Sequence, residues 1–277
     1  MDDKMLKDLQ KVELEILLEV DRICKKHNIR YFLVSGTLLG AVRHKGFIPW
    51  DDDIDICMPM KDYKKFCKVS RTEMKKEYFL QNSSTDYSDR WFAKVRKNNT
   101  TCIEKGYEKS FIHQGVWIDI FPLVGVHKDK KQLDKATKYA TFSKKLLSKR
   151  FAAFGDFKDL SIEKKFLRFV PLCIVRAIAR FIINITFRHN NKHEYCYYLW
   201  GDSKIRARFP FDLFDELCDI EFEGYMLSAP KRWDEYLTLV YGDYMTPPPP
   251  EKRNGGSHTI SILDLNNDYR IYTKTNK

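Results

Sequence analysis

The sequence contains Leu33-Val34-Ser35-Gly36-Thr37-Leu38-Leu39-Gly40 and, after a short cationic turn, Ile48-Pro49-Trp50-Asp51-Asp52-Asp53-Ile54-Asp55-Ile56. This stretch predicts a strand, a small-residue turn into a helix, and a second strand with alternating carboxylates. Successive strand side chains point to opposite faces, so Asp53 and Asp55 should share one face while Ile54 and Ile56 are buried on the other. Two neighbouring carboxylates repel each other, and Mg²⁺ binds such pairs while keeping positions for water and phosphates. The pattern indicates phosphoryl or nucleotidyl transfer.

A third acid, Asp119, lies between Ile118 and Ile120 in an apolar run. A carboxylate buried in such a run is costly unless it is paired or bound to a metal ion. Three carboxylates on strands suit a two-metal site that holds the attacking and leaving oxygens. The non-functional alternatives are that Asp51-Asp52-Asp53 is a solvated acidic turn and that Asp119 lies at a strand end, facing water or a helix N-terminus. We predict Mg²⁺ or Mn²⁺ as the cofactor, bound by Asp51, Asp53, Asp55 and Asp119.

Phosphate-binding groups are expected on both sides of these acids. The turn at Ser35-Gly36 would bring backbone N–H groups of a helix N-terminus to phosphate oxygens, and Ser35 could cap the helix Thr37–Val42. The cationic turn Arg43-His44-Lys45 could clamp phosphate from the opposite side, or it could be an ordinary surface turn. Lys94 and Arg96 alternate on a later predicted strand and are further substrate-binding candidates.

Hydrophobic periodicity predicts the remaining elements. Helices are expected at Met5–His27, 59–70, Lys130–Arg150, Ile162–Phe187, Lys192–Trp200 and Lys231–Val240. Strands are expected at Ile29–Val34, Asp53–Met58, Tyr78–Gln81, Gly115–Pro122, in a hairpin formed by Trp91–Val95 and Thr101–Glu104, and in a hairpin formed by Leu217–Phe222 and Tyr225–Ser228.

Charge is distributed unevenly along the 277 residues. The formal net charge is +11, and residues 128–208 alone carry 20 Lys and Arg against 7 Asp and Glu. This shift in composition predicts a catalytic core at 1–127, a basic helical insert at 128–208 and a C-terminal part at 209–277 that completes the core. A basic segment can meet an anionic surface or only solvent.

Residues 166–185 form an apolar run that is interrupted by Pro171 and by three arginines, Arg168, Arg176 and Arg180. Arginines disfavour a transmembrane span, and Arg176 and Arg180 lie one turn apart on a helix. This arrangement suits a helix in the membrane interface with its cations at headgroup level. The alternative is a core helix with snorkelling arginines.

The seven cysteines include no Cys-x-x-Cys pair, and several lie in apolar runs. They are interpreted as free thiols in a reducing compartment. The first residues lead directly into a charged helix without a secretory signal pattern. We therefore expect a cytoplasmic protein, either free or peripheral on the inner face of the cell membrane.

Ser35-Gly36, Asp53-Ile54-Asp55-Ile56 and Ile118-Asp119-Ile120 together resemble the pattern of the nucleotidyltransferase superfamily. The whole run from Ser35 to Asp55, with Trp117-Ile118-Asp119-Ile120-Phe121-Pro122-Leu123 and Tyr241-Gly242-Asp243-Tyr244-Met245, is similar to the LicD family. That family includes bacterial phosphocholine transferases and is related to fukutin-type phosphoribitol transferases. The resemblance covers most of the chain and is weakest in the middle segment.

The resemblance implies an α+β fold with a nucleotidyltransferase-like mixed sheet flanked by helices. It also implies transfer of phosphocholine from CDP-choline to a sugar hydroxyl of a teichoic acid or other glycan precursor, with release of CMP. We expect this acceptor to be lipid-linked. Asp53 and Asp55 would hold the metal ion, and Asp119 would complete the site or accept the hydroxyl proton. Choline calls for an aromatic cage, for which the candidates are Trp50, Tyr107, Trp117, Tyr241 and Tyr244.

Two alternatives stay open at this point. The same site could transfer another phospho-alcohol, such as phosphoribitol, or a nucleotidyl group, because carboxylates read only the diphosphate and the metal. A basic adaptor that binds membrane or RNA is the non-enzymatic alternative. An adaptor has no need of three strand carboxylates, and the sequence carries no RNA-binding signature, so we expect no nucleic-acid partner.

Overall fold

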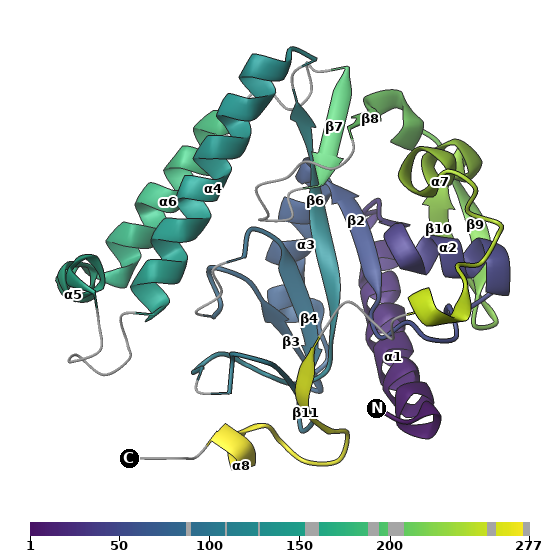
Figure 1. The fold of residues 1–277 in the computed structure, drawn as a ribbon, viewed down its shortest axis with the longest axis horizontal. Coiled ribbons are helices and arrows are strands. Elements are labelled where there is room, and N and C mark those ends of the chain that lie inside the picture. Colours follow the sequence, from purple (N-terminus) through teal and green to yellow (C-terminus); the bar gives the residue numbers. More distant parts are fainter. Residues whose placement is uncertain are drawn as a thin grey trace.

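A seven-stranded mixed sheet forms the centre of the fold (Figure 1). The computed structural model describes residues 1–86, 90–108, 110–126, 128–152, 161–187, 194–198, 208–253 and 259–273. The strand order is β1-β2-β6-β4-β3, and β7 pairs with both β6 and β8. The strands are β1 (Phe32–Leu33), β2 (Asp55–Pro59), β3 (Tyr78–Gln81), β4 (Ala93–Lys97), β6 (Trp117–Val126), β7 (Tyr195–Tyr198) and β8 (Phe209–Pro210).

The register of three central strands decides where the polar side chains lie. β2 and β6 are parallel and pair Asp55 with Asp119, while β4 is antiparallel to β6 and pairs Lys94 with Asp119. Paired residues on neighbouring strands share a face, so these three side chains project from the same side of the sheet. Their neighbours Ile56 and Ile118 project to the opposite side and are fully buried.

Two helices lie behind the sheet in Figure 1, α1 (Asp3–His27) and α3 (Met60–Glu73). The Asp2 side chain caps α1 by accepting a hydrogen bond of 2.7 Å from the Met5 N–H. Apolar residues at helical spacing, among them Leu9, Ile16 and Val20, are buried against the sheet. α1 thereby positions its inward-facing residues close to the strands that carry the acids.

The helix α2 (Ser35–His44) connects β1 to the acidic stretch, as the sequence predicts. A Cβ atom on Gly40 would lie 2.4 Å from the Gly46 carbonyl oxygen, so only glycine permits the chain to return this closely to α2. The hairpin β9 (Leu217–Phe222) and β10 (Tyr225–Pro230) and the helix α7 (Trp233–Tyr241) pack on the outer side of α2.

Three helices form a separate layer on the left of Figure 1. They are α4 (Lys130–Ala152), α5 (Ile162–Phe169) and α6 (Leu172–Thr186). Their inner residues, including Leu147, Val175 and Ala179, build a second small core with Val124 and Val126 of β6. Among the described residues, no helix combines the length and the apolar character needed to span a membrane.

The C-terminal part packs against the first part of the chain. After the 3₁₀ turns Phe211–Phe214 and Pro250–Lys252, strand β11 (Ile260–Asp264) pairs with β5 (Thr101–Glu104), and a short helix α8 (Arg270–Thr273) follows. Residues 1–126 and 208–273 thus share one body of packed elements. The boundaries at 127 and 208 stay a prediction, although β7 adds residues from the expected insert to the main sheet.

Several sequence-based expectations were wrong. Residues 195–198 form a strand instead of the helix Lys192–Trp200, because this tyrosine-rich segment pairs with the edge of β6. The helix expected at Ile162–Phe187 is two helices, since Pro171 cannot continue α5. The expected hairpin of β4 and β5 does not form. β4 pairs with β3 and β6, and β5 pairs with β11.

The cysteines behave as free thiols, as predicted. Cys24, Cys57, Cys102 and Cys196 are buried, Cys67 and Cys218 are half-buried, and Cys173 is exposed. Burial raises the pKa of the four buried thiols.

Candidate active site

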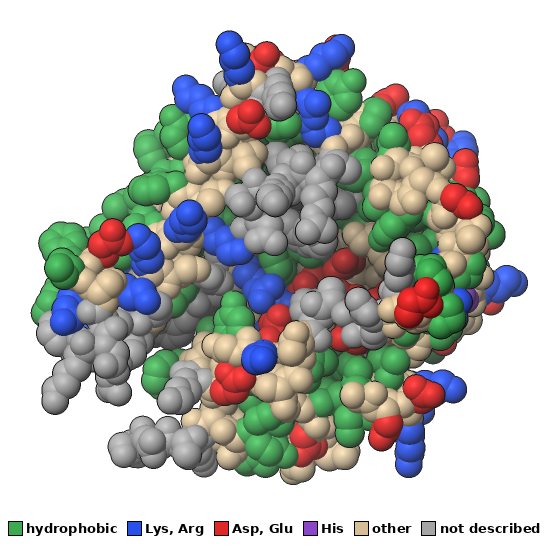
Figure 2. Space-filling view, viewed as in Figure 1, with side chains coloured by type: hydrophobic (Ala, Val, Ile, Leu, Met, Phe, Trp, Pro, Cys, Tyr) green, Lys and Arg blue, Asp and Glu red, His purple; other side chains and the backbone are tan. Residues whose placement is uncertain are grey.

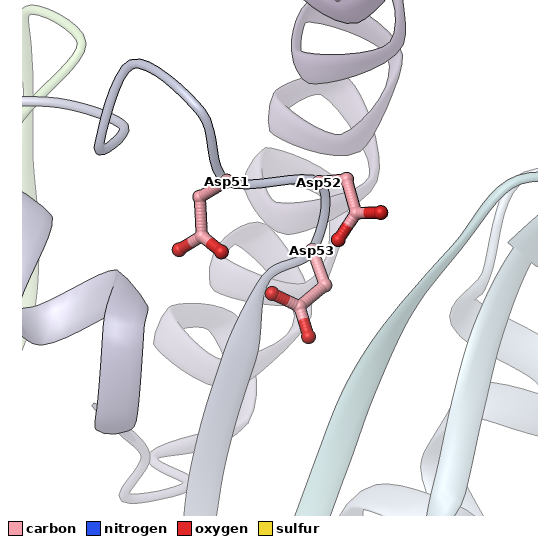
Figure 3. A group of neighbouring side chains, drawn as sticks. All are labelled: Asp51, Asp52 and Asp53. Atoms are coloured by element: carbon pink, nitrogen blue, oxygen red, sulfur yellow. The ribbon is translucent and has the colours of Figure 1, made fainter. Parts of the chain in front are cut away.

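Three consecutive aspartates form an acidic turn just before β2 (Figure 3). Asp51, Asp52 and Asp53 each offer a carboxylate oxygen, and these atoms lie within 4.8 Å of one another. The turn is fixed by the Asp51 N–H, which donates to the Ile48 carbonyl at 2.9 Å, and by the Gln10 side-chain amide, which donates to the Asp51 carbonyl at 2.9 Å. The backbone therefore holds the three acids together before any ligand is present.

The small-residue turn lies directly against this acidic turn. A Cβ atom on Gly36 would meet an Asp51 carboxylate oxygen at 2.6 Å, so glycine is required for their close approach. The Thr37 hydroxyl accepts the Asp55 N–H at 2.8 Å and connects the first turn of α2 to the start of β2. Thr37 is a positioning residue that the sequence reasoning missed.

Ser35 does not cap α2 with its side chain, contrary to the expectation. The N-cap residue is Val34, and Ser35 has φ 50°, in the left-handed region. Its N–H donates to the buried Tyr236 hydroxyl at 3.0 Å. Tyr236 of α7 thus holds the turn from behind, and the N–H groups available to a ligand are those of the following residues in the first helical turn.

Asp55, Asp119 and Lys94 occupy one rung of the sheet. The Lys94 Nζ lies 2.9 Å from an Asp119 carboxylate oxygen and 4.0 Å from the centre of the Trp117 ring, and both members of the ion pair are buried. Burial lowers the pKa of Lys94 to about 8, although the negative charge of Asp119 opposes this shift. Lys94 can therefore hold a proton or release it near neutral pH.

Arg96 lies further along the same strand and is engaged by protein groups. Its Nε donates to the Gln81 side-chain oxygen at 2.6 Å, and its Nη1 donates to the Gly115 carbonyl at 2.7 Å. The guanidinium also lies 4.9 Å from the Trp117 ring centre. Burial lowers the pKa of Arg96 to about 10. The Arg96 guanidinium is therefore already bound by protein groups and supports the Trp117 ring.

The cationic residues at the end of α2 lie apart from the acidic turn. Lys45 is about 15 Å along the helix from Ser35, and its Nζ pairs with Glu221 of β9 at 3.2 Å. Arg43 donates from Nη1 to the Tyr244 carbonyl at 3.0 Å and from Nε to the His44 ring at 3.0 Å. Arg43 is thus half-buried and held by these two groups, while His44 and Lys45 are exposed.

Trp50 lies at the rim and already receives a cation. The Arg253 guanidinium lies 4.9 Å from its ring centre. Arg253 was not identified from the sequence, because it follows the proline-rich segment far from Trp50 along the chain. Tyr241 also lies near the acids. Burial and Tyr236, followed by the charges of Asp55, Asp51 and Asp53, raise the pKa of its hydroxyl. Arg253, Trp50 and Tyr241 therefore border the acids with one cation and two aromatic rings.

Glu13 is a further acid that sequence reasoning missed. It projects inward from α1, is only 3% exposed, and one of its carboxylate oxygens has no hydrogen-bond partner among the described residues. Burial, followed by the charges of Asp53, Asp52 and Asp51, raises the pKa of Glu13 well above its usual value. In the predicted amphipathic helix, Glu13 was one of the charged residues on the polar faces. Its spacing therefore did not distinguish it from the others.

The electrostatic potential around the acidic turn is strongly negative. Burial and the neighbouring charges of Asp53 and Asp52 raise the pKa of Asp51 to about 8. Figure 2 shows acidic side chains gathered in a hollow near the centre of this face, with basic side chains next to them on the side of α4. Such a field attracts a cation, and it favours an anionic substrate only when a cation is bound.

The acidic turn fits a hard divalent cation. Its carboxylate oxygens are the donors that Mg²⁺ and Mn²⁺ prefer, and a bound cation would relieve the repulsion that raises the pKa of Asp51. Among the predicted metal ligands, Asp51 and Asp53 belong to the close group, which also contains Asp52. Asp55 and Asp119 form the neighbouring pair on β2 and β6.

Comparison with known proteins identifies the domain that carries this site. Residues 28–152 match the family model described as LicD/FKTN/FKRP, nucleotidyltransferase domain. Over 269 residues the chain is 29% identical to the lipopolysaccharide cholinephosphotransferase LicD of Haemophilus influenzae, covering 89% of this chain and 93% of that protein. It is 50% identical over 34 residues to the human ribitol 5-phosphate transferase FKRP, covering 12% of this chain and 7% of that protein.

The matched range includes the small-residue turn, the acidic turn, Lys94 and Asp119. The similarity to LicD continues through the helical layer and the C-terminal part, because it extends over most of both chains. Residues 28–152 therefore form a LicD-family nucleotidyltransferase domain, and the chain is a phosphotransferase.

Proposed function

We propose that this enzyme transfers phosphocholine from CDP-choline to a sugar hydroxyl of lipopolysaccharide, teichoic acid or a related surface glycan, and releases CMP. The observation that carries this proposal is the similarity to a lipopolysaccharide cholinephosphotransferase along 93% of that protein's length. In the reaction, the acceptor oxygen would form a bond to the phosphorus that bears choline. The bond from that phosphorus to the bridging oxygen would break, and CMP would carry this oxygen away.

The site residues support distinct parts of this reaction. A nucleotidyltransferase-like arrangement would place Mg²⁺ or Mn²⁺ on Asp51, Asp53 and Asp55, where the cation would neutralise charge on the diphosphate. The first turn of α2 would donate N–H groups to phosphate oxygens. Asp119 would accept the hydroxyl proton, and Lys94, paired with it at 2.9 Å, would set its orientation and charge.

The aromatic rim would bind the choline group. A quaternary ammonium ion is attracted to the faces of Trp and Tyr rings. Among the five candidates, Trp117 and Tyr107 already face Lys94 and Arg90, and the Tyr244 hydroxyl is bonded to Asp234. Trp50 and Tyr241 are the better choice, because both border the acids and the Trp50 ring already accommodates the cation of Arg253.

The test is to measure CMP release from CDP-choline with lipopolysaccharide as acceptor, with Mg²⁺, with Mn²⁺ and with chelator. Metal-dependent CMP release that requires the acceptor supports the proposal. CDP-ribitol is the second donor to assay, because of the short match to a ribitol 5-phosphate transferase. Acceptor-dependent CMP release from CDP-ribitol but not from CDP-choline would replace the donor and keep the reaction type.

The proposal includes an anionic membrane surface as the place of reaction. α5 exposes Phe166 (71%) and Phe169 (76%), and α6 exposes Phe181 (65%) with Ile174, Ile178 and Ile185, so each helix carries its own exposed apolar residues at helical spacing. α4, α5 and α6 together contain 13 Lys and Arg against 2 acidic residues. An apolar stripe flanked by cations complements anionic lipid headgroups and acyl chains.

The arginines singled out for this role face a different way. Arg176 donates to the Asp86 carbonyl at 2.6 Å, and Arg180 lines a cavity between α6 and the core. The membrane surface would therefore be the phenylalanine stripe, with the lysines of α4 and α5 around it.

Sedimentation with phosphatidylglycerol vesicles tests this surface. Wild type should bind these vesicles, bind neutral phosphatidylcholine vesicles weakly, and dissociate from the anionic vesicles as salt rises. Phe166→Ser with Phe169→Ser should reduce binding at least tenfold, since each exposed ring loses its transfer into lipid. Phe111→Ser is the matched control, because Phe111 is 80% exposed outside these helices. Equal binding of all three proteins would contradict a membrane role for the stripe.

A further inference from the structure

A cavity lies between α3 and α6, where the sheet and its helices meet the helical layer. It has a volume of about 370 Å³ and is bordered by α3, by the segment after β3, by the residues just before β4, and by α6. This volume is within the range of small-molecule binding sites. The cavity is separate from the acidic turn, and none of the residues assigned above to metal, phosphate or choline lines it.

The lining of this cavity is basic. Lys64, Arg71, Arg90 and Arg180 contribute to it, and no acidic residue of the described chain does. Arg90 pairs with Glu104 at 3.2 Å, and the Arg71 guanidinium donates to the Ser84 hydroxyl at 3.3 Å. Within the described residues, no carboxylate forms an ion pair with Lys64, Arg71 or Arg180. Three cations around one cavity repel one another unless an anion joins them.

Neutral hydrogen-bonding groups and an aromatic wall accompany these cations. Asn82, Ser84 and Asn184 line the cavity beside them. Trp91 also lines it and is only 9% exposed, and its indole N–H has no acceptor among the described residues. A buried donor without an acceptor is costly, and a bound oxyanion or sugar oxygen would satisfy it. Guanidinium and hydroxyl groups around an aromatic face suit a phosphate group attached to a sugar ring.

The cavity is linked to the active site through Arg90. The positive charge of Arg90 contributes to lowering the pKa of both Lys94 and Arg96, so it acts on the site as well as on the cavity. On its other side, the cavity is closed by α6, whose opposite face carries the exposed Ile178 and Phe181. A ligand in this cavity would thus lie between the proposed membrane stripe and the Asp119 region.

We propose that this cavity is an anion subsite that binds a phosphate group on the saccharide acceptor, at a sugar other than the one that receives phosphocholine. This assignment rests on the proposed function for the identity of the acceptor. The subsite would explain how an enzyme whose carboxylates read only the donor selects its glycan. It binds a phosphomonoester on a sugar ring, whether that sugar belongs to a free oligosaccharide or to one attached to lipid.

Calorimetry with glucose 6-phosphate, inorganic phosphate and glucose tests the subsite directly. The titrations are made in chelator, so that a metal ion on the acidic turn cannot bind the phosphate. Glucose 6-phosphate should bind more tightly than inorganic phosphate, and glucose should not bind measurably. Arg71→Gln with Arg180→Gln should weaken glucose 6-phosphate binding at least tenfold, since two charge-assisted hydrogen bonds are lost. Lys131→Gln with Lys138→Gln removes two exposed cations of α4 and should leave binding unchanged.

The outcomes separate this inference from the proposed function. Asp53→Asn should keep glucose 6-phosphate binding while it loses transfer. Glucose 6-phosphate binding by wild type without any CMP release would refute the phosphocholine reaction but support the subsite. Unchanged binding in the Arg71→Gln, Arg180→Gln variant would overturn the subsite, and so would equal affinity for inorganic phosphate and glucose 6-phosphate. The single variant Arg180→Gln should show a smaller decrease in glucose 6-phosphate affinity. It should fold normally, because Arg180 is exposed on α6.

Discussion

The central sheet buries charged side chains, whereas the helices α4 to α6 expose apolar ones. The sheet buries Asp55, Asp119, Lys94 and Arg96, whereas the helices expose phenylalanines and isoleucines along one face. Burying charge and exposing apolar area both cost stability unless a partner compensates. In the sheet, the compensation is partly internal, through the Lys94–Asp119 pair. In the helices, no described residue covers these side chains, and we propose that lipid supplies the compensation. The comparison teaches that the two regions carry different costs, which fits the chemistry proposed for the first and the membrane contact proposed for the second.

The largest effect should follow from removing one acid of the sheet region. Asp53→Asn should lower CMP release at least about a thousandfold, because charge stabilisation around a metal contributes several kcal/mol to phosphoryl transfer. Its thermal stability should not fall, since a repelling charge is removed. Asp8→Asn is the control, because Asp8 is an exposed acid of α1 that pairs with Lys11. Near-normal turnover of Asp53→Asn would remove the acidic turn from the reaction.

Breaking the buried ion pair should have the next largest effect, and this effect is on stability. Lys94→Met should lower the free energy of unfolding by about 3–5 kcal/mol, because Asp119 is left buried without its cation. The double variant Lys94→Met with Asp119→Asn should recover much of this loss, as measured by denaturant unfolding. If the single and double variants are equally unstable, the charges are not coupled and the sheet does not compensate internally.

A matched pair of isoleucines sharpens the comparison within one helix. Ile183 is 7% exposed and Ile185 is 54% exposed, and both belong to α6. Ile183→Ala should cost about 2–4 kcal/mol of unfolding free energy through the cavity it leaves. Ile185→Ala should stay within about 0.5 kcal/mol. Equal losses would mean that the outer face of α6 is packed against other parts of the chain.

The sheet region should also be the more sensitive to acid. His113 is buried, and burial lowers its pKa to about 3. Its Nδ1 accepts the Gly115 N–H at 3.1 Å, so its other ring nitrogen donates to the Asn98 side chain at 2.8 Å. The unfolded state takes up a proton below about pH 6.5 while the folded state resists it, so stability falls as pH falls from about 6.5 toward 3.

This group alone contributes a slope of up to about 1.4 kcal/mol per pH unit between about pH 6 and 4. His113→Asn should be less stable than wild type at neutral pH but should lose stability less steeply in this range. Urea unfolding at several pH values measures both slopes. Parallel curves for the two proteins would show that other groups control the acid sensitivity.

The sequence singled out Asp53, Asp55 and Asp119 as carboxylates among apolar residues, and Lys94 because it alternates with Arg96 on a predicted strand. Asp53 was expected on the strand with Asp55, but β2 begins at Asp55 and Asp53 lies in the turn before it. The register of Asp55 with Asp119 could not be derived, since pairing of distant strands leaves no local pattern. Arg253 and Glu13 were missed for a related reason: one arrives from the end of the chain, and the other occupies an ordinary helical position. The helix expected at residues 192–200 failed because tertiary pairing with β6 overrides a short local pattern.

The distribution of thiols makes α6 observable by itself. Cys173 is the exposed cysteine and follows the first residue of α6, whereas the other six are buried or half-buried. A maleimide dye or spin label added under native conditions should therefore react first at this position, without any engineered cysteine. The label would lie beside Ile174, at one end of the apolar stripe. The natural protein thus carries its own probe for whether that face is in water or in lipid.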